Sequence, residues 1–184
     1  AHIVGAVVPV AAAQTADVFV PRVALPDLSD MHAAVREQIL AAHRALAASE
    51  PAERSEGYGT LGALLLAGEY LVEAEICFLN AQRLAPDSYR WPYYLGHIYK
   101  NSGQLAQAVR QFEEARRLRP EDLATLVWLG QVQIDRGQPE AAMSLLAEAD
   151  KQHPETQAVR FQLGRSALAM GDHAGAVQHL EAAL

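Results

Sequence analysis

Residues 89–122 read YRWPYYLGHIYKNSGQLAQAVRQFEEARRLRPED, and they decide the fold because their key residues recur every 34 positions. A leucine and a glycine stand at the seventh and eighth places, alanine at the twentieth and twenty-seventh, and proline at the thirty-second. The eighth places hold Gly62, Gly96, Gly130 and Gly164, and the twenty-fourth places hold Phe78, Phe112, Leu146 and Leu180. A recurrence of this length indicates an array of equal structural units.

Each unit is expected to form two antiparallel helices, because a short polar turn containing glycine divides it, as in Asn101-Ser102-Gly103. The glycine of the eighth place lies inside the first helix, where it costs about 1 kcal/mol relative to alanine. Close approach of the paired helix explains that choice. The proline of the thirty-second place ends the second helix, and successive pairs stack on one another.

This pattern resembles the tetratricopeptide repeat family over about residues 55–184. The units are 55–88, 89–122, 123–156 and an incomplete 157–184. The resemblance implies an all-α fold, a right-handed superhelical solenoid of antiparallel helix pairs. It also implies that the first helix of each pair lines an inner, concave face.

Three segments precede the repeats. Residues 1–13, AHIVGAVVPVAAA, resemble the end of a secretory signal peptide, which predicts a periplasmic or secreted protein, with the cytoplasm as the alternative. The other interpretation of this stretch is an apolar strand or a disordered extension. It is too short to cross a bilayer, so no membrane insertion of the mature domain is expected. Residues 14–28 form an extended lead-in, and 29–54 a capping helix with Ser29 as N-cap, followed by a polar link.

Composition argues against several functions. A net charge of −7 disfavours nucleic-acid binding, and the basic cluster Arg110, Arg116, Arg117 and Arg119 is interpreted as a solvated outer face. The seven histidines lack the spacing of metal ligands, and the single cysteine, Cys77, is expected to be a packed apolar residue. No catalytic site, metal or cofactor is predicted.

The candidate binding site follows from the places that face the concave groove in proteins with this pattern. Aromatic residues stand there beside cations and amides, a mixture common in binding hot spots. The predicted partner-binding residues are Arg90, Tyr93, Tyr94, His97, Lys100, Asn101, Trp128, Gln131, Phe161 and Arg165. The alternative role for Tyr93, Trp128 and Phe161 is packing between adjacent first helices. Arg165 could hold a carboxylate through two parallel hydrogen bonds.

These features predict a non-enzymatic scaffold that binds a partner protein or peptide, extended or helical, in the groove of the second to fourth units. Two alternatives are a regulatory or substrate-recruiting arm of a larger enzyme and an exported envelope assembly factor. The final helix is expected to run apolar to Leu184 without a polar cap, which suggests self-association through the C-terminal repeat.

Overall fold

The computed structural model describes residues 20–184, and within that range every regular element is helical. The predicted signal-peptide end, residues 1–13, and the first part of the lead-in lie outside the described residues. The helices are α1 Ala33–Ala48, the 3-10 turn η1 Pro51–Glu53, α2 Arg54–Ala67, α3 Leu71–Leu84, α4 Arg90–Asn101, α5 Leu105–Leu118, α6 Leu123–Asp135, α7 Pro139–Gln152, α8 Gln157–Ala169 and α9 His173–Glu181. None of these described helices is long and apolar enough to span a membrane.

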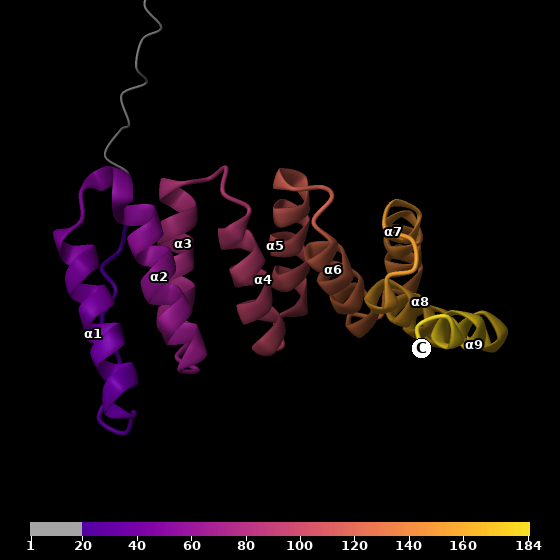
Figure 1. The fold of residues 1–184 in the computed structure, drawn as a ribbon, viewed down its shortest axis with the longest axis horizontal. Coiled ribbons are helices and arrows are strands. Elements are labelled where there is room, and N and C mark those ends of the chain that lie inside the picture. The colour runs from indigo at the N-terminus through magenta and orange to yellow at the C-terminus, as the bar shows by residue number, and fades with distance from the viewer. Residues whose placement is uncertain (1–19) are drawn as a thin grey trace, which may run out of the picture.

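The helices follow one another along a single row, from α1 at one end to α9 at the other (Figure 1). The pairs α2/α3, α4/α5, α6/α7 and α8/α9 are the four predicted units, and within residues 20–184 the main helix contacts join each helix to the next in the chain. The backbones of α6 and α8 also approach closely across an intervening helix, and side chains of α2 and α4, and of α4 and α6, meet in the same way. The prediction of an all-α helical solenoid is confirmed.

The glycine of the eighth place is explained by the side chain of the twenty-fourth place in the same unit. A Cβ atom added to Gly96 would lie 2.7 Å from Cε1 of Phe112, and one added to Gly164 would lie 2.6 Å from Cγ of Leu180. Both distances are below ordinary van der Waals contact. The predicted close approach of the paired helices is therefore confirmed, and in the first unit Cys77 shares the contact with Phe78.

The turn inside the first unit differs from the other three. Gly103, Gly137 and Gly171 adopt left-handed backbone conformations with φ of 72°, 80° and 80°. In the first unit the glycine stands one position earlier, at Gly68, and Glu69 takes the left-handed conformation with φ of 64°. A side chain is strained there, because its Cβ crowds the backbone.

The N-terminal segment caps the array in two parts. Helix α1 begins at Ala33, so the prediction of Ser29 as N-cap is wrong; His32 is the cap, and its Nδ1 accepts a hydrogen bond from the Ala34 amide at 3.3 Å. The Ser29 amide instead donates to the Asp27 carboxylate at 2.9 Å, which fixes a turn before the helix. The 3-10 turn η1 lies within the expected link, and α2 begins directly after it, at Arg54.

The described part of the lead-in is extended and fastened to the first unit. Val23 and Leu28 are each only 7% exposed. The carbonyl of Pro21 accepts a hydrogen bond from the Asn80 amide nitrogen at 2.7 Å, and the Tyr70 hydroxyl donates to the Asp27 carbonyl at 3.0 Å. This segment and α1 precede α2 and α3 by about one repeat length, so they stand in the place of a preceding helix pair.

At the other end, α9 stops at Glu181 rather than continuing to Leu184. Residues 182–184 form a turn, in which the Leu184 amide donates to the Glu181 carbonyl at 3.3 Å. The last helix is therefore shorter than the sequence predicts.

Candidate functional site

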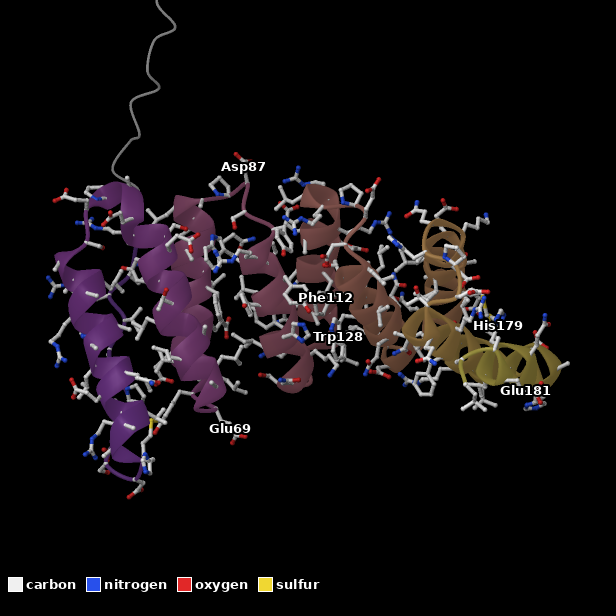
Figure 2. All side chains as sticks on the ribbon, in the orientation of Figure 1. Glu69, Asp87, Phe112, Trp128, His179 and Glu181 are labelled. Carbon is white, nitrogen blue, oxygen red and sulfur yellow. The ribbon has the colours of Figure 1, made fainter. Side chains whose placement is uncertain are left out.

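An aromatic cluster lies on the first helix of the second unit and reaches into both neighbouring units. The ring of Tyr94 stacks on Phe78 of α3 at a centroid distance of 4.8 Å, and Tyr93 meets His97 edge to face at 4.7 Å. His97 in turn packs edge to face on Trp128 of α6 at 4.8 Å. Figure 2 shows Trp128 and Phe112, two of the rings that pack against His97, in the middle of the array. Such contacts hold each ring in one orientation.

His97 is a neutral member of this cluster. Burial, with a smaller effect from the nearby Lys100 ammonium, lowers the pKa of His97 to about 4. The imidazole therefore carries no charge at neutral pH. It acts as a packed ring with one hydrogen-bond donor and one acceptor.

Lys100 extends the cluster towards the third unit. Its ammonium lies 4.9 Å from the centre of the Trp128 ring, within the range of a cation–π interaction. Asn101, one residue further on, is exposed at the end of α4. Both side chains are polar groups beside half-buried aromatic rings, as the sequence predicts.

A pocket of about 610 Å³ opens where these residues meet the first unit. Its walls are the aromatic rings of α4 and apolar side chains from the end of α2 and the start of α3. The lining residues are Leu66, Ala67, Glu69, Leu71, Tyr93, Tyr94, His97 and Asn101. Four of the predicted site residues are thus brought together in one cavity.

Arg165 and its neighbours form a separate polar network. Nη2 of Arg165 lies 2.9 Å from a carboxylate oxygen of Asp135, and Nη1 donates to the amide oxygen of Gln162 at 3.1 Å. Gln162 is buried and donates to Gln131 at 3.4 Å. The guanidinium of Arg165 is therefore already occupied by Asp135, and it does not present the unpaired fork expected for a carboxylate ligand.

Arg90 is also paired, at the opposite end of α4. Its Nη1 lies 3.0 Å and 2.8 Å from the two carboxylate oxygens of Glu56, and its guanidinium lies 4.6 Å from the Trp91 ring. Trp91 itself is fully buried. Arg90 thus links the first and second units, outside the pocket.

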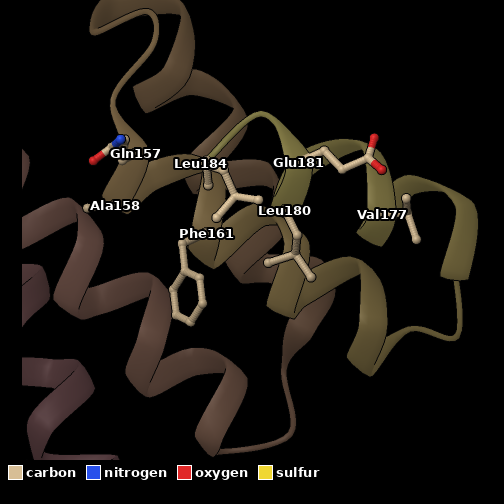
Figure 3. A pocket seen from close by; sticks show the side chains of 8 residues that line it. Gln157, Ala158, Phe161, Val177, Leu180, Glu181 and Leu184 are labelled. Carbon is tan, nitrogen blue, oxygen red and sulfur yellow. The ribbon is translucent and has the colours of Figure 1, made fainter.

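Phe161 lies away from the pocket, on the C-terminal face of the array. It is 50% exposed and lines an apolar hollow of about 570 Å³ between α8 and α9. Figure 3 shows Phe161, Leu180, Val177 and Leu184 around this hollow. The predicted packing role of this ring against another first helix is not seen within residues 20–184.

The predicted site did not include the four lining residues of the first unit, which are Leu66, Ala67, Glu69 and Leu71. Leu66 and Leu71 provide apolar walls, and Glu69 provides a carboxylate at the α2/α3 turn. Figure 2 shows Glu69 at the tip of that turn. The sequence does carry a sign of this turn. The fifteenth place of the unit is glutamate in the first unit, whereas the other three units have glycine there, as Gly103, Gly137 and Gly171.

Cys77 and the basic cluster of α5 are engaged in contacts within the fold. Cys77 is fully buried, and burial raises the pKa of its thiol to about 12, with a smaller effect from Glu73. The expectation of a packed residue is confirmed. In the basic cluster of α5, Arg117 pairs with Glu114 at 2.7 Å and Arg119 stacks on Tyr89 at 3.6 Å. The described residues contain no group of three metal-ligating side chains.

The helix pairs stack in one row, and small residues lie where the two helices of a pair cross. This arrangement defines a helical repeat protein. The model of the tetratricopeptide repeat family matches residues 99–163, which confirms the resemblance that the 34-residue period indicates. None of the curated proteins compared with the chain matches it significantly.

Several solved structures share the fold. A crystal structure of MamA protein superimposes with a TM-score of 0.74 at 18% identity, over 82% of this chain and 81% of that chain. MamA from Desulfovibrio magneticus RS-1, from residue 41 to its end, gives 0.66 at 19% identity, over 83% and 94%. YrrB, described as a TPR protein with an unusual peptide-binding site, gives 0.71 at 19% identity, over 82% and 76%. At these identities the similarity shows a common fold.

Proposed function

We propose that this protein is a non-enzymatic scaffold that holds a partner protein or peptide on its inner face, with the pocket between the first and second units as the main contact. The observation that carries the proposal is the 610 Å³ pocket, in which Tyr93, Tyr94, His97 and Asn101 meet Leu66. Apolar walls with a few convergent polar groups are typical of binding sites.

The arrangement is suited to an apolar side chain of the partner. The rings of Tyr93 and Tyr94 are half-buried and held by their contacts with His97 and Phe78, so they lose little freedom when a ligand binds. His97 is uncharged and adds no penalty for burying an apolar group. The pocket therefore favours an aromatic or aliphatic residue over a charged one.

The polar groups around the pocket suit the backbone of the same partner segment. Asn101 can donate to and accept from a peptide group, and Lys100 beside Trp128 can donate to a carbonyl further along. Glu69 places a carboxylate at the pocket, which favours a basic residue next to the apolar one. YrrB, which has a similar fold, is described as having a peptide-binding site, and this supports a peptide as the ligand.

Peptides selected from a random display library against the immobilised protein test this proposal. Their affinities are measured by calorimetry on the wild type, on Tyr94→Ala and on Asn101→Ala. We expect selected peptides to share an apolar residue beside a lysine or arginine and to bind Tyr94→Ala at least tenfold more weakly. Val72→Ala is the control, because Val72 is 67% exposed on the outer helix α3. Circular dichroism verifies that each variant is folded.

Unchanged affinity of folded Tyr94→Ala and Asn101→Ala for the selected peptides would overturn the assignment of the pocket. Equal losses in Val72→Ala would also contradict it, since Val72 does not line the pocket.

A further inference from the structure

A second pocket lies at the N-terminal end of the array, on surfaces that the proposed function does not use. It has a volume of about 510 Å³ and is formed by the lead-in, the second half of α1 and the first half of α2. Its lining residues are Val20, Arg22, Val23, His43, Leu46, Ala47, Arg54 and Tyr58. Two guanidinium groups, an imidazole and a phenol thus converge on one cavity with apolar walls.

The lead-in brings Arg22 to this pocket through fixed neighbours. The Pro21 carbonyl on one side is held by Asn80 at 2.7 Å, and Val23 on the other side is buried. Because both adjacent residues are fastened to the helices, the position of the Arg22 backbone is determined. Arg54 comes from the first turn of α2, and Tyr58 stands one turn further on the same helix.

The charges in the pocket are not balanced by acidic groups. No aspartate or glutamate lines it, and within residues 20–184 neither Arg22 nor Arg54 takes part in an ion pair. The contrast is with Arg90, Arg160 and Arg165, each of which pairs with a carboxylate. Two guanidinium groups that are unpaired within the described residues therefore line one cavity in a chain of net charge −7.

The feature is confined to the first unit. One repeat length after Arg54 stands Ser88, and the later equivalents are Asp122 and Thr156. A requirement of repeat stacking would have placed similar residues at each junction. The basic pocket is therefore not explained by the architecture of the array.

We infer that this N-terminal pocket binds a small organic anion, a carboxylate attached to an apolar body. Arg22 and Arg54 neutralise and hydrogen-bond the carboxylate, and Val20, Val23 and Leu46 contact the apolar body. The Tyr58 hydroxyl donates a further hydrogen bond; burial raises the pKa of Tyr58, so this hydroxyl keeps its proton. This inference concerns a different cavity from the peptide pocket and is independent of it.

Amide chemical shifts recorded by NMR during titration of the whole protein test the inference with three probes. The probes are 4-phenylbutyrate, its neutral amide 4-phenylbutyramide, and inorganic phosphate. We expect 4-phenylbutyrate to shift resonances of the lead-in, α1 and α2, and each of the other two probes to bind at least tenfold more weakly. The carboxylate must lose at least tenfold in affinity in the double variant Arg22→Gln/Arg54→Gln.

Arg83→Gln is the matched control, because Arg83 is an exposed arginine at the end of α3 outside the pocket. It should bind 4-phenylbutyrate as the wild type does. Arg22→Gln alone is measured too, since Arg54 starts a helix and its replacement could disturb folding.

Equal binding of the amide would remove the role of the charge, and equal binding of phosphate would remove the role of the apolar walls. The inference is also overturned if folded variants bind 4-phenylbutyrate with wild-type affinity, or if no shifts occur around the pocket.

Discussion

The buried indole of Trp91 lies directly against the backbone of Gly59, so that a Cβ atom on Gly59 would collide with its Cη2 and Cζ3 atoms. Gly59 belongs to the first helix of the first unit and Trp91 to the first helix of the second. The absence of a side chain at position 59 therefore provides space for the largest ring in the core. Phe78 packs on the same indole, with ring centres 6.3 Å apart.

Gly59→Ala should destabilise the protein, because the indole of Trp91 is enclosed on all sides and cannot move away. Overpacking of this kind costs typically about 2 kcal/mol. Urea unfolding followed by tryptophan fluorescence measures the free energy of unfolding. Thr60→Ala, an exposed change on the same helix, serves as control and should stay within about 0.5 kcal/mol of the wild type. A Gly59→Ala variant as stable as that control would show that the indole can be displaced.

Glu69→Gly should stabilise the fold and weaken binding. Glycine accepts the left-handed conformation that Glu69 adopts with φ of 64°, and relief of the strain is worth about 1 kcal/mol. The carboxylate at the peptide pocket is lost in the same change. Thermal unfolding and peptide calorimetry on one sample measure both effects. Loss of stability, or gain of affinity for basic peptides, would contradict the role assigned to this residue.

His97 should make the protein less stable as the pH falls. Its pKa is about 4 in the folded state, whereas a histidine in the unfolded chain has a pKa near 6.5. Between these values the unfolded state binds a proton that the folded state does not, so the free energy of unfolding decreases from pH 6.5 towards pH 4. Denaturant unfolding at several pH values, compared with His97→Gln, isolates this contribution. The same pH dependence in both proteins would mean that His97 does not cause it.

Self-association through the C-terminal repeat remains a prediction, and the exposed apolar side chains of Phe161 and Val177 favour it. Sedimentation velocity at rising protein concentration should show a larger species in the wild type and much less of it in Val177→Asp. Val72→Asp is the control, since Val72 is an exposed valine on α3, remote from this face. A concentration-independent monomer, or equal effects of both changes, would argue for another role of this face.

The repeat architecture could be predicted because its signals are local and recur in register. Gly96 with Phe112 and Gly164 with Leu180 show the same contact in different units, so the period alone implied it. Within the candidate site, Tyr93, Tyr94, His97 and Asn101 line one pocket, because helical spacing fixes which residues share a face.

Features that depend on two distant segments could not be predicted in this way. The pairing of Arg165 with Asp135 depends on how two long side chains extend between adjacent units. The strained backbone at Glu69 arises because the glycine of this turn stands one position earlier than in the other units. The left-handed conformation of Glu69 follows from the geometry of the turn, which the sequence does not give. The extended lead-in has no periodic pattern, so its attachment through Asn80 and Tyr70 was not visible in the sequence.

The restriction of the main helix contacts to neighbours has a consequence for regulation. The basic pocket involves α1 and α2, whereas the apolar face involves α8 and α9, and the whole array lies between them. Coupling energy between two sites requires an intervening element with two discrete arrangements, and packed units that contact only their neighbours attenuate it at each junction. Ligands at the two ends should therefore bind without cooperativity, and each affinity can change independently of the other.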